Sequence, residues 1–462
     1  MALLNSKPGN DSPPNGRGVE DADSQGKRQQ NLYDLKTKLH QEIINKIDVD
    51  LLVKLDTNTG RREVAKFVSS LVNEDNFPLS AIEKQRVINE VVDETFGLGP
   101  LEPLFDDPSI DDILVNSYCN VYIERHGKIE KTNIRFKDDG HLRHIINRIV
   151  ARIGRRIDEA SPMVDARLAD GSRVNAIIPP LALDGPMLSI RRFKTIPLSE
   201  KNLLEMGCVS EEMLILLKTA IRARMNIVIS GGTGAGKTTL LNILSGNIPF
   251  NERIITIEDA AELQLQQPHV GRLETRPANM EGKGRVTQRD LFVNSLRMRP
   301  DRIIVGEVRG AEALEMLQAM NTGHDGSLTS VHANSARDAL TRIETMVLMS
   351  NTNMEQQAIR RNISSAINIV VQIRRYSDGT RRVESISELT GMEQDIITMQ
   401  EIACYVQKGI SQDGKSVGLF KVHPIRPKFL ERAHELGVSF AKIAEEVTHQ
   451  KDGKTQPEAD QT

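Results

Sequence analysis

One glycine-rich stretch holds the residues of this chain that are best suited to bind phosphate. Residues 231–238 fit the pattern G-x-x-x-x-G-K-[ST] at every position. Glycines let consecutive backbone N–H groups curve around phosphate oxygens, Lys237 would reach the β- and γ-phosphates, and the Thr238 hydroxyl would bind Mg²⁺. The predicted nucleotide-binding residues of this loop are Gly231, Gly232, Thr233, Gly234, Ala235, Gly236, Lys237, Thr238 and Thr239.

Two strand-like segments end in carboxylates that could serve hydrolysis. Residues 302–307 are hydrophobic and end in Glu307, which could orient or deprotonate a water near the γ-phosphate. Gly306 stands where an Asp would be usual. Residues 255–259 end in Glu258 and Asp259, and these adjacent carboxylates could hold a Mg²⁺-bound water and compensate for the missing Asp. We therefore expect Glu307 and Glu258 to be catalytic, with Thr238 and Glu258 at the metal.

Two histidines stand eight residues apart after these strands. His324 lies in a glycine turn and His332 at a strand end. A shared metal lacks an obvious third ligand. A role as γ-phosphate sensor or subunit contact is favoured, and an ordinary hydrogen-bonded histidine remains an alternative for each.

Arginine is concentrated before the phosphate loop, because residues 143–192 contain nine Arg and no Lys. Arg forms planar, bidentate phosphate contacts that Lys cannot form. Arg173 and Arg191 lie in strand-like stretches and are candidate arginine fingers, which contribute roughly 10³–10⁵ in rate. We expect the remaining group, at 152, 155 and 156, to form a solvated helix face.

The elements that must position these residues change character along the chain. Residues 1–30 are polar and predicted to be disordered, 31–97 have helical patterns, and 98–195 mix strands and helices as an α+β domain. Strands and helices alternate over 196–430, which is typical of a parallel sheet with crossover helices. Residues 431–462 are expected to form a C-terminal helix and a polar tail.

Local signals add detail to this division. Apolar residues share one face over 32–47 and another over 64–72, and Ser80 with Glu83 forms a capping box. These helices could be a small bundle or surface helices on the next domain. Asp138 and Asp139 can cap a helix that runs to Gly154. Residues 169–172 and 377–380 are predicted hairpin turns.

Composition excludes several classes of protein. The 462 residues have a net charge of −3, no Trp and 3% aromatic residues, so we expect no direct contact with nucleic acid. The three cysteines include no C-x-x-C pair, which predicts neither a zinc site nor disulfides and fits a reducing cytoplasm. No apolar run approaches the roughly 18 residues of a membrane span, so action at a membrane would require partners.

These motifs, in this order, resemble those of the ATPases of type II and type IV secretion systems and type IV pili. The boxes that carry the resemblance are the phosphate loop and residues 255–259, 297–309 and 322–334. Residues 97–104, 111–116 and 167–176 are similar to the CpaF/TadA subgroup, which serves the tight-adherence (Flp) pilus. The resemblance covers about residues 60–435, and Gly306 is itself typical of the family.

The resemblance implies a RecA-like P-loop ATPase domain preceded by an α+β domain and a small helical region. It further implies a homo-hexamer, peripheral to the cytoplasmic face of the inner membrane, with ATP and Mg²⁺ bound between the two domains. Glu307 would be the catalytic residue and Glu258 would support metal and water. His324 and His332 would contact neighbours or phosphate, and Arg173 and Arg191 would reach toward the nucleotide.

Three functions follow from these expectations. The main one is a motor that drives assembly or retraction of a tight-adherence pilus through inner-membrane platform proteins. The alternative is a type IV secretion motor for DNA or effector protein, usually built without so long an N-terminal extension. A weakly hydrolysing nucleotide-binding regulator is a third, but the intact Lys237, Thr238, Glu258 and Glu307 argue against it.

Overall fold

The computed structural model describes residues 57–74, 79–125, 127–193, 198–278, 283–350 and 353–451. The chain divides into two compact units, residues 1–192 and 193–462. The predictions for residues 1–30, for the helical pattern over 32–47 and for the tail beyond 451 lie outside the described residues. No helix among the described residues is long and apolar enough to cross a membrane.

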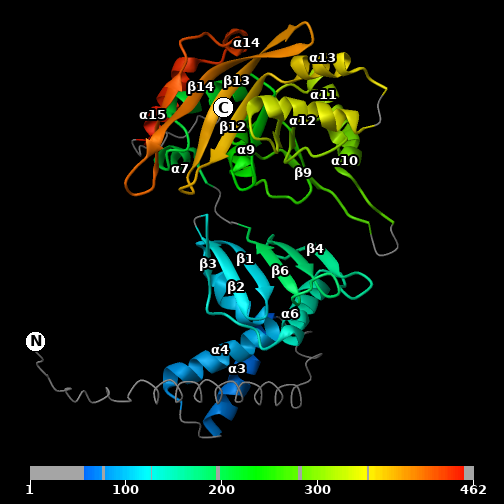
Figure 1. Cartoon of the computed structure of the whole chain (residues 1–462), viewed down its shortest axis with the longest axis vertical. Coiled ribbons are helices and arrows are strands. Elements are labelled where there is room, and N and C mark those ends of the chain that lie inside the picture. Colours follow the sequence, from blue (N-terminus) through cyan, green and yellow to red (C-terminus); the bar gives the residue numbers. More distant parts are fainter. Residues whose placement is uncertain are drawn as a thin grey trace, which may run out of the picture. The chain divides into compact units, whose positions relative to one another are not determined.

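Two paired helices, α3 (Thr57–Glu74) and α4 (Ala81–Phe96), come first among the described residues of the first unit (Figure 1). The predicted capping box starts α4: the Ser80 side chain accepts a hydrogen bond from the backbone N–H of Glu83, and the Glu83 side chain accepts one from the backbone N–H of Ser80. The two helices bury a small core of their own against each other. Its buried members are Val64, Val68, Val72, Val87, Ile88, Val91 and Val92.

Arginines of a further helix, α6 (Asp139–Arg152), form hydrogen bonds to α4. Arg148 donates to the carbonyl of Glu94, and Arg152 donates to that of Phe96. These contacts satisfy carbonyls at the C-terminal end of α4, which have no partner within that helix. Arg152 and residues 155 and 156 are all exposed, as expected, but 155 and 156 lie beyond the end of α6, so the three do not form one helix face.

A six-stranded antiparallel sheet forms the body of the first unit, in the order β3-β2-β1-β6-β5-β4. Alternate strand residues such as Ile113, Val174 and Ile190 pack with α6 in one core. The predicted turn at 169–172 joins β4 to β5. The strands are β1 (Ile110–Ser117), β2 (Asn120–Arg125), β3 (Lys128–Lys131), β4 (Met163–Arg167), β5 (Arg173–Ile177) and β6 (Met187–Arg191), and η1 (Gly99–Leu101) and α5 (Glu102–Asp106) precede them.

The opposite face of this sheet has a row of charged residues across four neighbouring strands. Asp112 is the register partner of Arg191, Arg191 of Arg173, and Arg173 of Arg167. Arg191 Nε lies 3.3 Å from Asp112 Oδ1. Like charges directly opposite each other weaken a sheet, so the pairing of Arg173 with Arg191 and with Arg167 does not stabilise these strands.

The second unit is built on a nine-stranded sheet, in the order β15-β14-β13-β12-β7-β11-β10-β8-β9. The strands from β12 to β9 in this order are all parallel to their neighbours. This confirms the predicted parallel sheet. The parallel strands are β7 (Ile227–Gly231), β8 (Ile254–Glu258), β9 (Val270–Glu274), β10 (Arg302–Val305), β11 (Leu328–Val331) and β12 (Ile369–Arg375).

Helices cover both faces of this sheet (Figure 1). Ile227 and Ile229 point into the core that contains α8 and α9, whereas Val228 points into the core that contains α10 to α13. The first face carries α7 (Glu200–Glu205), α8 (Glu211–Arg222) and α9 (Lys237–Ser245). The second carries α10 (Gln288–Ser295), η2 (Leu296–Met298), α11 (Glu312–Asn321), α12 (Ala336–Leu348) and α13 (Gln356–Ala366).

Three antiparallel strands extend the sheet beyond β12: β13 (Arg381–Glu393), β14 (Ile396–Ile410) and β15 (Ser416–Val422). The predicted turn at 377–380 joins β12 to β13. Two helices follow, α14 (Phe429–Glu435) and α15 (Phe440–Lys451). Ile443 and Val447 of α15 are fully buried in the core that contains α8, so α15 is part of the second unit.

Candidate functional site

The phosphate loop lies between the buried strand β7 and the first turn of α9, as the sequence predicts. Gly234 and Gly236 have φ of 67° and 96°, which only glycine adopts without strain. A side chain on Gly231 would place its Cβ 2.5 Å from the carbonyl oxygen of Ile373 on β12. The loop therefore depends on glycine for its backbone conformation and for the close approach of a neighbouring strand.

Lys237 begins α9 and is partly buried within the loop. Its Nζ donates to the carbonyl oxygen of Gly232 at 3.3 Å. Burial lowers the pKa of this ammonium, and the nearby Glu307 carboxylate opposes that shift. The free N–H groups of the first turn of α9 add the positive end of the helix dipole, so the loop favours an anion.

Both expected carboxylates lie at the same edge of the sheet as the loop. Glu258 ends β8, and Glu307 follows β10 by two residues. Because β7, β11, β10 and β8 are parallel neighbours, their carboxyl ends meet at one edge. The structure thus brings together residues from segments far apart in the sequence.

Glu258 is only 2% exposed, although it is a carboxylate. Its Oε2 accepts hydrogen bonds from the backbone N–H groups of Glu262 at 2.7 Å and Leu263 at 3.0 Å. Its Oε1 is buried and has no hydrogen-bond partner among the described residues. Burial raises the pKa of Glu258, so this carboxylate is costly to ionise without a cation or a donor beside Oε1.

Gly306 has a steric role that the sequence did not reveal. A Cβ at this position would lie 3.0 Å from Cγ of Glu258. A side chain such as Asp would therefore crowd the buried carboxylate. Gly306 thus leaves room for Glu258. Whether Glu258 and Asp259 also compensate for an Asp at this position stays a prediction.

Glu307 is held by an arginine that the sequence prediction did not single out. Arg309 Nη2 donates to Glu307 Oε2 at 2.7 Å, and Arg309 Nη1 lies 3.6 Å from Asp259 Oδ2. Asp259 is thus paired with Arg309, unlike the buried Glu258 beside it. The only sequence signal was the position of Arg309 within two residues of the expected base.

The two histidines lie at opposite ends of β11, so they do not share a metal. His332 follows the carboxyl end of β11, beside the loop, and burial, followed by the charge of Lys237, lowers its pKa. This imidazole is therefore neutral at pH 7 and can hydrogen-bond a phosphate without adding charge. His324 precedes β11, at the edge away from the loop, and is not part of the nucleotide site of its own chain.

A cavity of about 320 Å³ adjoins the loop. It is open enough to admit a ligand and is lined by residues of the loop, of β12 and of the segment after β11. The lining residues are Gly232, Thr233, Ala235, Asn334, Gln372, Ile373, Arg374 and Arg375.

The family model described as "Type II/IV secretion system protein" matches residues 94–456. This chain belongs to that family. It is accordingly a nucleotide-binding ATPase, with a RecA-like P-loop domain as its second unit and an α+β domain before it.

Proteins and solved structures similar to this chain have names more specific than that of the family. A Mycobacterium tuberculosis protein, provisionally named for conjugal transfer, is 35% identical over 330 residues, covering 70% of this chain and 93% of that protein. The VirB11 type IV secretion protein of Brucella suis is 30% identical over 329 residues, covering 65% and 91%. The crystal structure of that VirB11 ATPase covers 63% of this chain and 96% of its own, with a TM-score of 0.34.

The residues at this edge fit a bound Mg²⁺. The ion prefers oxygen ligands and keeps several of its waters. The Thr238 hydroxyl in the first turn of α9 and the unpartnered Oε1 of Glu258 are oxygen donors of this kind. Ser330 is a further positioning residue, because its Oγ donates to the carbonyl oxygen of Gly306 at 2.7 Å and so fixes the turn that carries Glu307.

Replacing Gly306 by alanine should separate binding from hydrolysis in this ATPase. The added Cβ would press on Glu258 while leaving the loop and Lys237 in place. We expect Gly306→Ala to lower ATP turnover, by less than the roughly 100-fold that a displacement of about 1 Å costs, with little change in nucleotide affinity. Steady-state phosphate release and titration with a fluorescent nucleotide measure the two effects.

Gly409→Ala on β14 is the matched control, because a Cβ there meets nothing within 4 Å. Equal turnover in Gly306→Ala and Gly409→Ala would contradict the steric role of Gly306.

Proposed function

We propose that this protein is an ATP-hydrolysing hexameric motor of a type IV secretion machine, which moves DNA or effector protein out of the cell. The observation that carries the proposal is that relatives named for conjugal transfer and type IV secretion align over 91–93% of their own length. The complete phosphate loop with Glu258 and Glu307 supports hydrolysis rather than binding alone.

The site residues have separable roles in this proposal. The loop N–H groups and Lys237 bind the ATP phosphates, and Glu307 accepts a proton from the attacking water. Glu258, with Thr238, holds Mg²⁺, which when bound neutralises charge on the phosphate oxygens. His332 contacts the γ-phosphate as a neutral hydrogen-bonding group.

We further propose that Arg173 and Arg191 complete the site as arginine fingers, from the same chain or a neighbour in the ring. Their support is the direct pairing of Arg173 with Arg191 on the face of the sheet opposite its core, where neighbouring positive charges favour an anionic ligand. We place His324 at contacts between neighbouring subunits, since it lies away from the loop of its own chain. The motor would act at the cytoplasmic face of the inner membrane through membrane partners, without binding nucleic acid itself.

A tight-adherence pilus motor remains the second candidate. The segments at 97–104, 111–116 and 167–176 favour it, as does the part of this chain that the conjugal-transfer relatives leave unmatched. The names of those relatives favour secretion, and we rank it first for that reason.

Replacing Glu307 by glutamine should abolish hydrolysis but leave ATP binding intact. Gln keeps the shape of the side chain and can still accept from Arg309, but it cannot take a proton. We expect turnover to fall by roughly 10²–10⁴-fold. Phosphate release from the purified ring measures it, and Glu393→Gln, at an exposed site on β13, is the control. Wild-type turnover in Glu307→Gln would remove Glu307 as the base.

Alanine at Arg173 or Arg191 should lower kcat by about 10³-fold or more if both residues stabilise the transition state. Arg167→Ala removes the same charge from the next strand of the row and is the matched control. Equal losses in all three variants would point to surface charge instead of a specific contact. Steady-state ATPase rates and nucleotide titration separate kcat from binding.

A chromosomal Glu307→Gln strain distinguishes secretion from pilus motion. We expect loss of DNA or effector export to recipient cells, because the motor is present but cannot hydrolyse ATP. We expect surface pili to be unchanged, because a secretion motor does not drive their assembly. Mating frequency, effector translocation and electron microscopy of pili are the measurements. Loss of surface pili with normal export would overturn the secretion assignment in favour of the pilus.

A further inference from the structure

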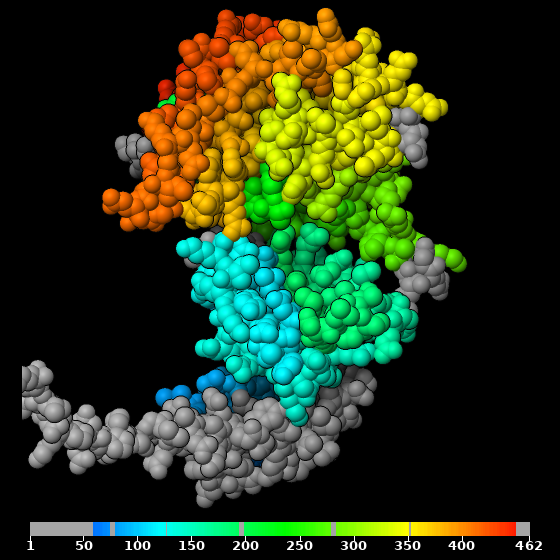
Figure 2. Space-filling view, in the orientation of Figure 1, coloured from blue at the N-terminus to red at the C-terminus, as the bar shows by residue number. Residues whose placement is uncertain are grey.

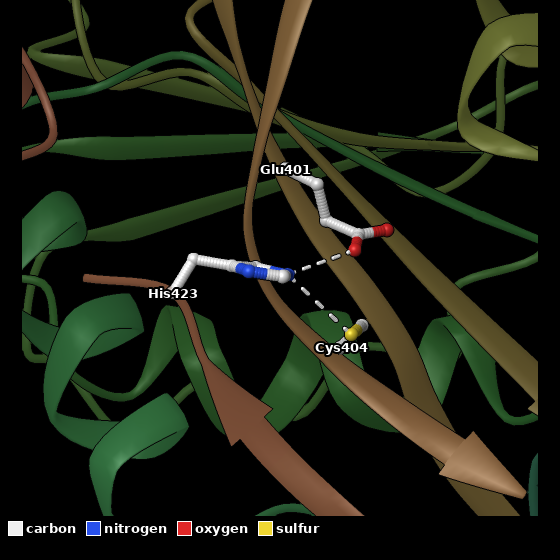
Figure 3. Close-up of side chains that lie close together, drawn as sticks. All are labelled: Glu401, Cys404 and His423. Atoms are coloured by element: carbon white, nitrogen blue, oxygen red, sulfur yellow. Dashed lines mark hydrogen bonds and ion pairs between the residues drawn. The ribbon is translucent and has the colours of Figure 1, made fainter. Parts of the chain in front are cut away.

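Three side chains with metal-binding atoms converge away from the nucleotide site, on β14 and just after β15 (Figure 3). His423 Nε2 lies 3.1 Å from Glu401 Oε1 and 3.6 Å from Cys404 Sγ. One ligand atom from each residue lies within 4.8 Å of the others. These strands form one flank of the surface of the second unit (Figure 2).

A β-bulge brings Glu401 and Cys404 to one side of β14. Residues three apart on a regular strand point to opposite faces. Here β14 has an extra residue, because Ala403 pairs with Ile386 and Glu401 with the next residue, Ser387. Ile402 is the extra residue, and it and Ala403 are both buried. The bulge therefore turns Glu401 and Cys404 to the same side.

The same bulge fixes the third member of the cluster. The backbone N–H of His423 donates to the carbonyl oxygen of Ile402 at 2.8 Å. His423 directly follows the end of β15, which is the edge strand of the sheet. The backbone thus holds all three side chains at one place without help from a ligand.

The geometry does not suit a cysteine nucleophile. In a relay of that kind, the acid and the nucleophile contact different nitrogens of the imidazole ring. Here Glu401 and Cys404 both face Nε2. Burial, followed by the neighbouring Glu401, raises the pKa of the Cys404 thiol to about 11, so the thiol is not activated.

We propose that Glu401, Cys404 and His423 bind a zinc ion, with solvent as the fourth ligand. Tetrahedral zinc, with Zn–S of about 2.3 Å and Zn–N and Zn–O of about 2.0–2.1 Å, separates its ligand atoms by roughly 3.3–3.6 Å. The His–Glu and His–Cys separations of 3.1 and 3.6 Å are close to these values. A mixed sulfur, nitrogen and oxygen donor set suits zinc better than the oxygen-preferring Mg²⁺ or Ca²⁺.

A zinc ion here would join the edge strand to its neighbour. It would link residues on β14 to the residue after β15, the outermost strand of this sheet among the described residues. The Glu401 side chain is 47% exposed, which leaves room for a solvent ligand. The expectation of no zinc site depended on the lack of a C-x-x-C pair. That criterion does not detect ligands that a bulge and a strand end bring together from separate positions in the sequence.

Cobalt substitution tests the site directly, because a thiolate ligand gives Co²⁺ a charge-transfer band in the near ultraviolet. The full chain, stripped with chelator, should bind one Co²⁺ with this band, and Zn²⁺ should displace it. Cys404→Ser should abolish the band. His423→Gln and Glu401→Gln should weaken Zn²⁺ binding by more than the roughly 10–100-fold that loss of an outer-shell partner costs.

Cys119→Ser is the matched control, because Cys119 is free and lies in the first unit. Added Zn²⁺ should also raise the unfolding temperature of the wild type and of Cys119→Ser, but not of Cys404→Ser. Co²⁺ binding without a thiolate band, or a band that survives in Cys404→Ser, would overturn the proposal. If Cys404→Ser does not fold, unchanged Zn²⁺ affinity in the exposed-site variant Glu401→Gln would overturn it equally.

Discussion

The parallel alignment of β7, β11, β10 and β8 is the constraint on which the nucleotide site depends. Parallel strands end at one edge, so whatever follows each strand meets its neighbours there. The phosphate loop, His332, Glu307 and Glu258 are the residues at these four ends. No contact between the side chains is needed to gather them, because the backbone pairing of the strands does so.

At this edge of the sheet, the burial of Glu258 determines how strongly the site favours a cation. A carboxylate with one satisfied and one unpartnered buried oxygen is costly alone and favourable beside a cation. The pair Glu258 and Gly306 is better understood as one unit, in which the glycine supplies the volume that the carboxylate fills. This explains a glycine where charge would have been expected.

The sequence predicted the elements of the second unit well, because buried parallel strands are short apolar runs and the loop pattern is specific. It could not separate His324 from His332, since only the direction of β11 shows that they lie at opposite edges. It also missed Arg309, whose importance comes from reaching both Glu307 and Asp259. The bulge at Ile402 was beyond prediction, because it exists only in the pairing of β14 with β13.

Lys237 and Glu307 both make contacts for which a phosphate would compete. Lys237 donates to a carbonyl of its own loop, and Glu307 is paired with Arg309. An arriving phosphate competes for both cations, since it offers more negative charge than a carbonyl or a single carboxylate. We expect Arg309 to turn toward the phosphate and so to leave Glu307 free to accept a proton, as the role that we propose for Glu307 requires. The base would then be released by the substrate on which it acts.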